Sequence, residues 1–359
     1  MATRVMIMAG GTGGHVYPAL AVAEELRSRG CDVFWLGTPD SFESRTVPQA
    51  GIPLDTIDSH RLRGEGRLNK LLAPLRLLRA MWQALRVLHR RRPQVLLGMG
   101  GFASGPGGLV ARVLRLPLVI HEQNAIPGLT NRALSRIATR TLQAFPGSFP
   151  SKRKAAVCGN PVRADILRIA RPQERFADRG HQPIQLVVIG GSLGAQALNE
   201  MMPQALAMLD ENERPQVIHQ AGRGKLETTL QAYADSGVAA DVREFLDDMP
   251  SVYAAADLVV CRSGALTVSE LAAAGVAALL VPFPFAVDDH QTSNARYLVE
   301  AGAARLVQQR DLDAPMLASL VRELCADRRV LLEMACAARE LARPDATDCV
   351  ADICLEVAA

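Results

Sequence analysis

The sequence has no long apolar run, few aromatic residues and no closely spaced cysteine pair. It contains no run of 18 apolar residues, and too few precede Gly10 for a signal peptide, so any membrane contact is expected to be peripheral. Aromatic residues make up only 4% of the chain and do not interleave with the basic residues, which argues against a nucleic-acid-binding protein. The seven cysteines fit neither a zinc site nor a disulfide framework. We therefore expect a reducing cytoplasm and buried thiols at Cys31, Cys158 and Cys261.

Charge is divided unevenly between the two halves of the chain. Residues 1–163 hold 23 Lys and Arg against 9 Asp and Glu, whereas the remainder holds 17 basic and 28 acidic residues. The two opposite charges nearly cancel, which leaves a formal net charge of only +3. It points the N-terminal half toward an anionic partner, such as nucleic acid or a membrane surface.

A unit of strand, glycine turn and helix occurs twice, in VMIMAGGTGGH (5–15) and LVVIGGSLGA (186–195). Such a turn places backbone N–H groups at a helix N-terminus, where the helix dipole favours an anion. Neither copy fits the dinucleotide fingerprint, because its third glycine is replaced by Val16 or Gln196. A single copy is equally typical of any parallel sheet. Two copies predict two phosphate-facing domains.

Short apolar runs alternate with helical patterns along the chain, which predicts an α/β fold with two doubly wound parallel sheets. We expect strands near 5–9, 32–36, 95–98, 117–121, 139–143, 185–189, 216–219, 258–261 and 278–282, and helices including 18–29, 193–209 and 265–274. The expected domains are 1–163 and 164–343, with an exposed connector at 166–183 and a helix in 344–359 that packs back on the first domain. Ligands of such sheets bind beyond the carboxyl ends of the strands, so the halves are expected to face one cleft.

The segment between His60 and Arg92 is both basic and apolar, with ten Lys and Arg and one acidic residue. Pro74 suits a first helical turn and Pro93 ends a helix, so a helix is expected over 74–91. An apolar stripe with tryptophan beside arginines is typical of an interfacial helix, although a crossover helix would bury such a stripe on its sheet. The expected membrane contacts, from the leading loop at 61–72 and from the helix, are Leu68, Leu71, Leu72, Leu75 and Trp82.

Seven motifs occur in order along nearly the whole chain: GGTGGH, GGFASGP, HEQNAIPG, GNPVR, GGSLGA, RSGALTVSE and DDHQTSNA. Together they closely resemble those of the MurG family of bacterial glycosyltransferases. The resemblance implies the GT-B architecture, with two Rossmann-like domains facing a central cleft. It further implies inverting transfer of N-acetylglucosamine from its UDP derivative to the C4 hydroxyl of the muramyl sugar of undecaprenyl-pyrophosphoryl-MurNAc-pentapeptide, the step from lipid I to lipid II in peptidoglycan synthesis. Such an enzyme works at the cytoplasmic face of the cell's inner membrane as a peripheral protein.

The resemblance also implies which residues hold the substrates. Ser192 and Arg163 are expected to contact the donor diphosphate, although a serine at that position is equally an N-cap. Glu270 is expected to accept hydrogen bonds from the ribose hydroxyls, unless it is an ordinary carboxylate on a helix surface. The complete expected set is Thr12, Gly13, Gly14, Asn124, Arg163, Ser192, Leu246, Ala265, Leu266, Thr267, Val268, Ser269, Glu270, Gln291 and Asn294.

The chemistry of the bond predicts the catalytic groups. A sugar hydroxyl is a weak nucleophile, so its reaction needs a base nearby and stabilisation of the departing diphosphate. His15 is the leading candidate because histidine titrates near neutrality, with Glu122 and Asn124 as contributors. His15 is alternatively a backbone-bonding residue of the turn, and His121 and Glu122 are equally explained as structural residues at a strand end. Neither a metal nor a cofactor is expected, and Asp311-Leu312-Asp313 is interpreted as helix capping.

Other functions share parts of this pattern. A UDP-sugar epimerase or another GT-B transferase would use the same architecture and donor site, but the epimerase would lack a lipid-binding face. A nicotinamide-dependent oxidoreductase would need the missing glycine fingerprint. A membrane-recruited binding protein would associate with lipid without releasing UDP.

Overall fold

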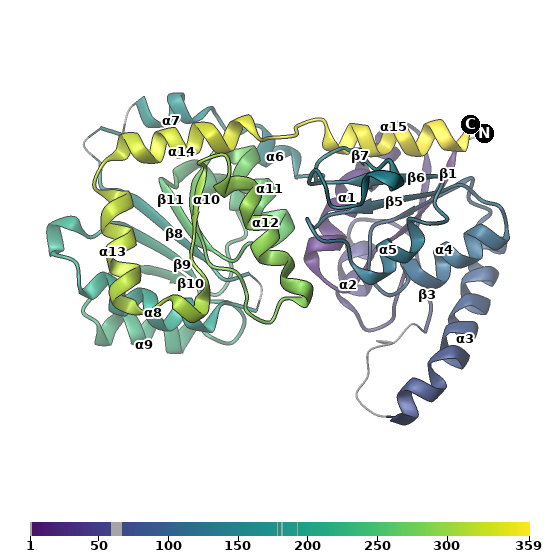
Figure 1. Ribbon diagram of the computed structural model, residues 1–359, viewed down its shortest axis with the longest axis horizontal. Coiled ribbons are helices and arrows are strands. Elements are labelled where there is room, and N and C mark those ends of the chain that lie inside the picture. The colour runs from purple at the N-terminus through teal and green to yellow at the C-terminus, as the bar shows by residue number, and fades with distance from the viewer. Residues whose placement is uncertain (1, 59–66, 178, 181, 192) are drawn as a thin grey trace. The chain divides into compact units, whose positions relative to one another are not determined.

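The computed structural model describes residues 2–58, 67–177, 179–180, 182–191 and 193–359, with backbone only for 67–72. The chain divides into two compact units (Figure 1), one made of Met1–Arg163 with Arg343–Ala359, the other of Ala164–Ala342. Arg343 thus joins the first unit, one residue earlier than the expected boundary.

The first unit is built on a seven-stranded parallel sheet with the order β3-β2-β1-β4-β5-β6-β7. Its strands are β1 (Arg4–Met8), β2 (Asp32–Gly37), β3 (Leu54–Thr56), β4 (Val95–Gly98), β5 (Leu118–Glu122), β6 (Arg140–Gln143) and β7 (Ala156–Val157). Its helices are α1 (Gly13–Ser28), α2 (Phe42–Gln49), α3 (Arg67–Arg91), α4 (Ser104–Val113), α5 (Leu129–Leu134) and α15 (Ala346–Ala358), with a 3-10 turn η1 (Ser151–Arg153). Two buried clusters flank the sheet, one under α1 and α15 and one under α3 and α4.

The second unit repeats the plan with a six-stranded parallel sheet in the order β10-β9-β8-β11-β12-β13. Its strands are β8 (Gln185–Ile189), β9 (Gln216–Gln220), β10 (Asp241–Arg243), β11 (Leu258–Cys261), β12 (Ala277–Leu280) and β13 (Ala304–Leu306). Its helices are α6 (Ala164–Leu167), α7 (Pro172–Ala177), α8 (Gln196–Ala207), α9 (Leu226–Asp235), α10 (Met249–Ala255), α11 (Ala265–Ala274), α12 (His290–Val299), α13 (Ala314–Cys325) and α14 (Arg328–Glu340). Short 3-10 turns are η2 (Glu211–Glu213), η3 (Val287–Asp289) and η4 (Gln309–Asp311).

The C-terminal helix α15 belongs to the first unit, where it packs against α1, β4 and β5. Val350, Ala351 and Cys354 are its fully buried residues. Around this apolar contact, Arg29, which follows α1, pairs with Asp348 at 2.8 Å and with Asp352, and the more exposed Arg140 pairs with Glu356 at 3.0 Å. Exposed pairs of this kind each contribute little, so burial of the apolar face holds the helix in place.

One cysteine expectation is wrong, because the structure joins Cys158 to Cys349 in a disulfide, with Cα atoms 5.9 Å apart. The pair is separated by 191 residues and comes together only because α15 returns to the end of β7. Cys261 remains a fully buried thiol, and burial raises its pKa to about 12. Cys31 is also a free thiol and is partly buried.

Helix α3 begins at Arg67, earlier than the expected start at Pro74, and ends at Arg91 as expected. Residues 67–72 are therefore helical rather than part of a leading loop, while 61–66 lie outside the described residues. Pro74 is exposed within this helix and lacks the N–H that would donate to a carbonyl one turn earlier.

Contrary to the crossover-helix alternative, the apolar stripe of α3 is not buried on the sheet. Leu75, Leu78 and Trp82 are 63%, 61% and 56% exposed. The face of α3 that packs on the sheet consists instead of small and aliphatic residues, Ala80, Ala84, Val87 and Leu88. This leaves the tryptophan-bearing stripe open to solvent. Within the described residues, no helix is both long and apolar enough to span a bilayer.

The expected exposed connector at 166–183 is exposed only in part, because some of its described residues pack on the rest of the second unit. Phe176 and Ile166 are buried. Arg175 donates to the carbonyl oxygens of Tyr253 at 3.2 Å and Ala274 at 3.1 Å, which lie at the ends of α10 and α11. Cations are favoured at helix C-termini, so Arg175 caps these two helices. The same segment also has exposed charged residues, Arg168, Arg171 and Glu174.

Candidate functional site

In the first unit, helix α1 starts within the first glycine motif. It begins at Gly13 rather than near residue 18, and the Thr12 carbonyl accepts the N–H groups of His15 and Val16 at 3.1 Å. His15 therefore sits in the first turn of the helix and is partly buried. Thr12 is exposed, and Gly13 and Gly14 are partly exposed, so all three remain accessible to a ligand.

A buried carboxylate lies beneath this glycine turn. Glu43 is 1% exposed and accepts hydrogen bonds from the Gly11 N–H at 3.0 Å and from the Thr38 hydroxyl at 2.8 Å. Burial opposes ionisation of Glu43, but these hydrogen bonds outweigh it and lower its pKa. The glycine turn was expected to offer its backbone N–H groups to a bound anion. The Gly11 N–H instead donates to Glu43 of the protein.

A chain of hydrogen bonds runs inward from the His15 ring. His15 Nδ1 lies 2.8 Å from Gln123 Oε1. Gln123 Nε2 lies 3.2 Å from His121 Nδ1 and 3.3 Å from the His121 carbonyl oxygen. His121 Nε2 lies 2.8 Å from the Gly159 carbonyl oxygen. Gln123 and His121 have no exposed surface, so the hydrogen bonds inward from the His15 ring are shielded from solvent.

Two glycines of the GGFASGP motif make room for that ring. Gly100 has a φ of +94°, and a Cβ there would lie 3.0 Å from Cε1 and Nδ1 of His15. At Gly101, with a φ of +87°, a Cβ would lie 2.5 Å from the Gly10 carbonyl oxygen. The two glycines let the loop after β4 approach the first glycine turn closely.

Glu122 lies on the other side of β5 from His121 and organises the following loop. It is 1% exposed and accepts from the backbone N–H groups of Asn124 at 3.0 Å and Gly128 at 3.1 Å, and from the Asn131 amide at 2.9 Å. The Asn124 amide also donates to Glu122 at 3.1 Å. This geometry favours the structural interpretation of Glu122, with Asn124 oriented by it.

The two buried histidines predict an acid-sensitive fold. Burial lowers the pKa of His121 and of His219 to about 4. The unfolded chain takes up these protons below a pH of about 6.5, whereas the folded chain does so only near 4, so the unfolding free energy falls as the pH drops across this window. The loss is about 1.4 kcal/mol per pH unit for each histidine.

Urea unfolding at pH 7 and pH 5 measures this loss. In a His219→Asn variant the second unit is expected to lose less stability on acidification, whereas replacement of the exposed His89 by Asn leaves the pH dependence unchanged. Equal unfolding free energies of the wild type at both pH values would contradict the assignment.

In the second unit, the glycine turn after β8 packs backbone to backbone on a neighbouring loop. A Cβ on Gly194 would collide with the Ala221 carbonyl oxygen, and one on Gly222 would collide with the Gly194 nitrogen. Helix α8 then starts at Gln196, and no side chain of the described residues caps its N-terminus at Ala195. Ser192 lies outside the described residues.

The remaining expected donor residues lie at the carboxyl ends of neighbouring strands. The register pairs Ile189 with both Cys261 and Gln220, so the loops after β8, β9 and β11 begin at one edge of the sheet. Helix α11 starts there, as expected, at Ala265, followed by Leu266, Thr267, Val268, Ser269 and Glu270. Leu246 follows β10, and Gln291 and Asn294 lie on α12.

Glu270 is not the helix-surface carboxylate of the alternative interpretation. It is 7% exposed and accepts a hydrogen bond from the Tyr253 hydroxyl at 3.2 Å. Asn294 is fully buried and donates to the Ser263 carbonyl oxygen at 3.2 Å, while Gln291 accepts from the Phe283 N–H at 2.9 Å. Arg163, at the end of the first unit, is half-buried.

The Asp311-Leu312-Asp313 sequence caps a helix, as expected. The Asp313 carboxylate accepts from the Met316 N–H at 2.9 Å at the start of α13. Among the described residues, no group of three His, Cys, Asp or Glu is placed to hold a metal ion.

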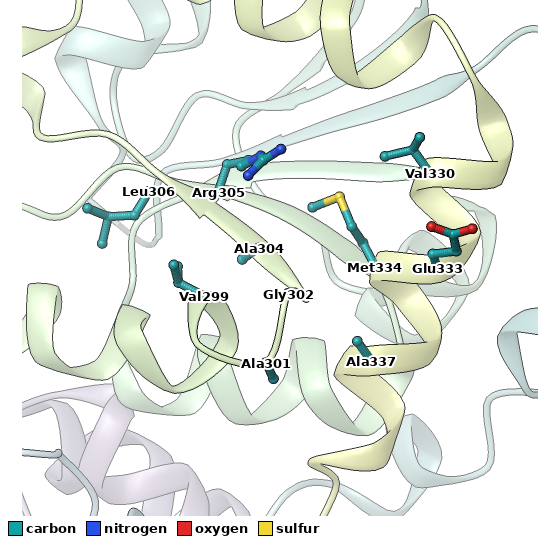
Figure 2. A pocket seen from close by; sticks show the side chains of 10 residues that line it. All are labelled: Val299, Ala301, Gly302, Ala304, Arg305, Leu306, Val330, Glu333, Met334 and Ala337. Atoms are coloured by element: carbon teal, nitrogen blue, oxygen red, sulfur yellow. The ribbon is translucent and has the colours of Figure 1, made fainter.

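A pocket of about 660 Å³ in the second unit lies apart from these residues. Figure 2 shows it between the turn after α12, the edge strand β13 and helix α14, with Arg305 and Glu333 as its charged residues. It contains none of the residues that the sequence analysis expects to bind the donor.

Sequence reasoning missed Gln123 as a functional residue and left His121 as a structural alternative. Alternation in the strand that ends at Glu122, continued one residue further, would have placed residues 121 and 123 on the same side. Glu43 had no motif to mark it, because its role depends on a contact across 32 residues.

Two Rossmann-like parallel-sheet domains are the architecture of the GT-B glycosyltransferases, and comparisons with known proteins place the chain in that class. Residues 5–143 match the glycosyltransferase family 28 N-terminal domain, and residues 185–350 match its C-terminal domain. A glycosyltransferase of kitacinnamycin, 18% identical with a TM-score of 0.73 over the full length of both chains, shares the fold.

Curated relatives define the family more closely. The chain is 53% identical over the full length of both proteins to the UDP-N-acetylglucosamine--N-acetylmuramyl-(pentapeptide) pyrophosphoryl-undecaprenol N-acetylglucosamine transferase of Nitrosospira multiformis, and 54% identical, again over both full lengths, to that of Alkalilimnicola ehrlichii. The crystal structure of Acinetobacter baumannii MurG is 43% identical with a TM-score of 0.87, covering 99% of each chain. The chain belongs to glycosyltransferase family 28 and, within it, to the MurG family, which confirms the resemblance of the seven motifs.

Proposed function

We propose that this chain transfers N-acetylglucosamine from UDP-N-acetylglucosamine to the C4 hydroxyl of undecaprenyl-pyrophosphoryl-MurNAc-pentapeptide, with inversion at the anomeric carbon. The observation that carries the proposal is identity above 50%, over the whole length, to enzymes named for this transfer. The buried Glu270 and the accessible His15 supply groups that the reaction needs.

The second unit holds the donor in this proposal. The Glu270 carboxylate accepts hydrogen bonds from the two ribose hydroxyl groups. The hydrogen bond from the Tyr253 hydroxyl orients this carboxylate for that role. The diphosphate lies at the N-terminus of α8, where no acidic residue occupies the first turn and the N–H groups favour an anion. Arg163 and Ser192 contact the same diphosphate, and the Leu246 backbone meets the base. The fixed amides of Gln291 and Asn294 shape the sugar pocket.

The first unit holds the acceptor sugar and the base. His15 takes the proton of the C4 hydroxyl as the oxygen forms its bond to the anomeric carbon. The bond from that carbon to the UDP oxygen breaks, and UDP leaves with the electron pair. Backbone N–H groups and Arg163 stabilise the departing charge. Attack opposite the leaving group converts the α-linked donor into a β-linked product.

The exposed stripe of α3 serves as the membrane contact in this proposal, at the cytoplasmic face of the inner membrane. Leu75, Leu78 and Trp82 supply apolar area, and Arg86 lies 4.8 Å from the Trp82 ring. Apolar side chains enter the acyl boundary while arginines meet anionic headgroups. Leu68, Leu71 and Leu72 precede them on the same helix.

A double variant tests this contact. Replacing Leu75 and Leu78 with serine is expected to weaken binding to vesicles with anionic lipid by about tenfold or more, because each buried CH₂ contributes about 0.8 kcal/mol. Trp82 reports binding by fluorescence, since the other tryptophan, Trp35, is fully buried. Met208→Ser, which replaces an exposed apolar residue of the second unit, is the matched control. Equal vesicle binding by the double variant and the wild type would contradict the proposal.

The activity itself is tested by UDP release. The proposal expects release from UDP-N-acetylglucosamine only when the lipid-linked muramyl acceptor is present, with one disaccharide formed per UDP. Conversion of UDP-N-acetylglucosamine without an acceptor and without incorporation into a disaccharide would favour the epimerase. Lipid association without UDP formation would favour a binding protein.

A further inference from the structure

The hydrogen bonds inward from His15 leave little freedom in where its protons lie. The Gly159 carbonyl oxygen can only accept, so the nearby Nε2 of His121 must carry a proton. Burial lowers the pKa of His121 to about 4, so the ring is neutral near pH 7. Its Nδ1 is therefore an unprotonated acceptor.

The orientation of the Gln123 amide follows from two acceptors. Its nitrogen lies near both the His121 Nδ1 and the His121 carbonyl oxygen, and neither of these can donate. The amide oxygen must then face His15 Nδ1, at 2.8 Å. Because that oxygen only accepts, His15 Nδ1 carries the proton, and in the neutral ring the lone pair lies on Nε2.

We infer that Gln123 and His121 are positioning residues that hold His15 in the tautomer with Nε2 unprotonated, ready to accept the proton of the acceptor hydroxyl. The inference rests on the proposed role of His15 as the base. Both residues are fully buried, so they act through His15 and do not contact substrate. We call His15, Gln123 and His121 the relay. The Asn160 amide donates to the Gln123 carbonyl oxygen at 3.1 Å, and the Gly159 carbonyl oxygen accepts from His121. Two residues of the GNPVR motif therefore hold the two buried members of the relay.

The charged and titratable groups in or next to this relay include His15, Glu122 and Arg343, whose side chain packs beside Gly159. His15 is the outer end, and Glu122 is adjacent along β5 but directs its carboxylate to the loop at 124–131. The last acceptor in this series of hydrogen bonds is the Gly159 carbonyl oxygen rather than a carboxylate. The relay therefore fixes the tautomer of His15 without placing a negative charge in contact with its ring.

The test compares Gln123→Met with Gln123→Glu. Methionine has a similar length but no acceptor for His15 Nδ1, so kcat is expected to fall about 10- to 100-fold while both KM values stay within about twofold. A glutamate that carries a proton on the oxygen facing His121 still donates there and still offers an oxygen acceptor to His15 Nδ1, so this variant is expected to retain most of kcat. A purely structural role for Gln123 would change thermal stability and KM in both variants without this split.

Nitrogen-15 NMR of the full chain reads the tautomer directly, with the His15 signals assigned from their loss in His15→Ala. The wild type is expected to show a protonated Nδ1 and a bare Nε2, and Gln123→Met a shift toward protonated Nε2. A wild-type His15 with protonated Nε2 in its neutral form would overturn the inference, even if the variant does not fold. Full activity of His15→Ala would instead overturn the proposed base. An impaired His15→Ala beside an unaffected Gln123→Met would overturn the relay alone.

Discussion

His15→Ala is expected to lower kcat about 10²- to 10⁴-fold, the usual contribution of a positioned general base. The KM for UDP-N-acetylglucosamine should stay within about twofold, because His15 lies in the first turn of α1 in the first unit and the expected donor-binding strand ends lie in the second. The unfolding free energy should change little, because the His15 ring is only partly buried. Among the described residues, the ring has one hydrogen bond, to Gln123. Steady-state kinetics with the lipid-linked acceptor measures both constants.

His89→Ala is the matched control for this experiment. That histidine is exposed in the last turn of α3 and makes no part of the proposed site, so its removal should leave kcat unchanged. If His15→Ala and His89→Ala both keep wild-type kcat, His15 is not the base.

Gly194→Ala is expected to disrupt the proposed donor site of the second unit. A Cβ would collide with the Ala221 carbonyl oxygen, and the φ of +67° is unfavourable for alanine. Left-handed strain of about 1–2 kcal/mol adds to an overpacking cost of about 1–3 kcal/mol, so the unfolding free energy of this unit should fall by about 3 kcal/mol. The affinity for UDP should fall at least about tenfold, since the displaced loop leads into α8. Calorimetry with UDP and urea unfolding measure the two effects.

Gly237→Ala separates the collision from the strain. Gly237 has a similar φ of +63°, but a Cβ there meets nothing within 4 Å. This variant should lose only the strain term, about 1–2 kcal/mol, and keep its affinity for UDP. Equal losses of unfolding free energy and of UDP affinity in the two variants would show that the close packing of Gly194 against Ala221 contributes to neither.

The central strands of both sheets could be predicted from sequence, and the edges could not. Strands β4, β8 and β11 fall on the expected residues, because continuous apolar runs mark strands buried on both faces. The four missed strands, β3, β7, β10 and β13, are the outermost strands of their sheets and have only two or three residues each. Such segments are too short to show a period and have too little burial to need apolar residues.

Pro18 and Pro74 misled the prediction of helix starts for one reason. Proline suits the first turn of a helix, so the sequence predicts a start at each. In the structure both lie inside helices that begin five or more residues earlier. The loss of one hydrogen bond is tolerated when the rest of the helix packs well. The sequence left open whether the apolar stripe of α3 faces the sheet or solvent, since apolar residues alone do not say which partner they face.

The candidate site was predicted at the level of motifs but not of contacts. His15 and Glu270 follow from the family pattern, whereas the Gln123 relay and the carboxylate of Glu43 depend on loops brought together by the sheet register. The prediction that both glycine turns open onto one cleft concerns the placement of the two units and stays a prediction.

The most direct test of the account is the NMR structure of the disaccharide made by the purified chain from UDP-N-acetylglucosamine and the lipid-linked muramyl acceptor. The account predicts a β-linked N-acetylglucosamine on the C4 oxygen of the muramyl sugar. An α linkage, another acceptor oxygen, or the absence of any disaccharide from the folded protein would contradict it.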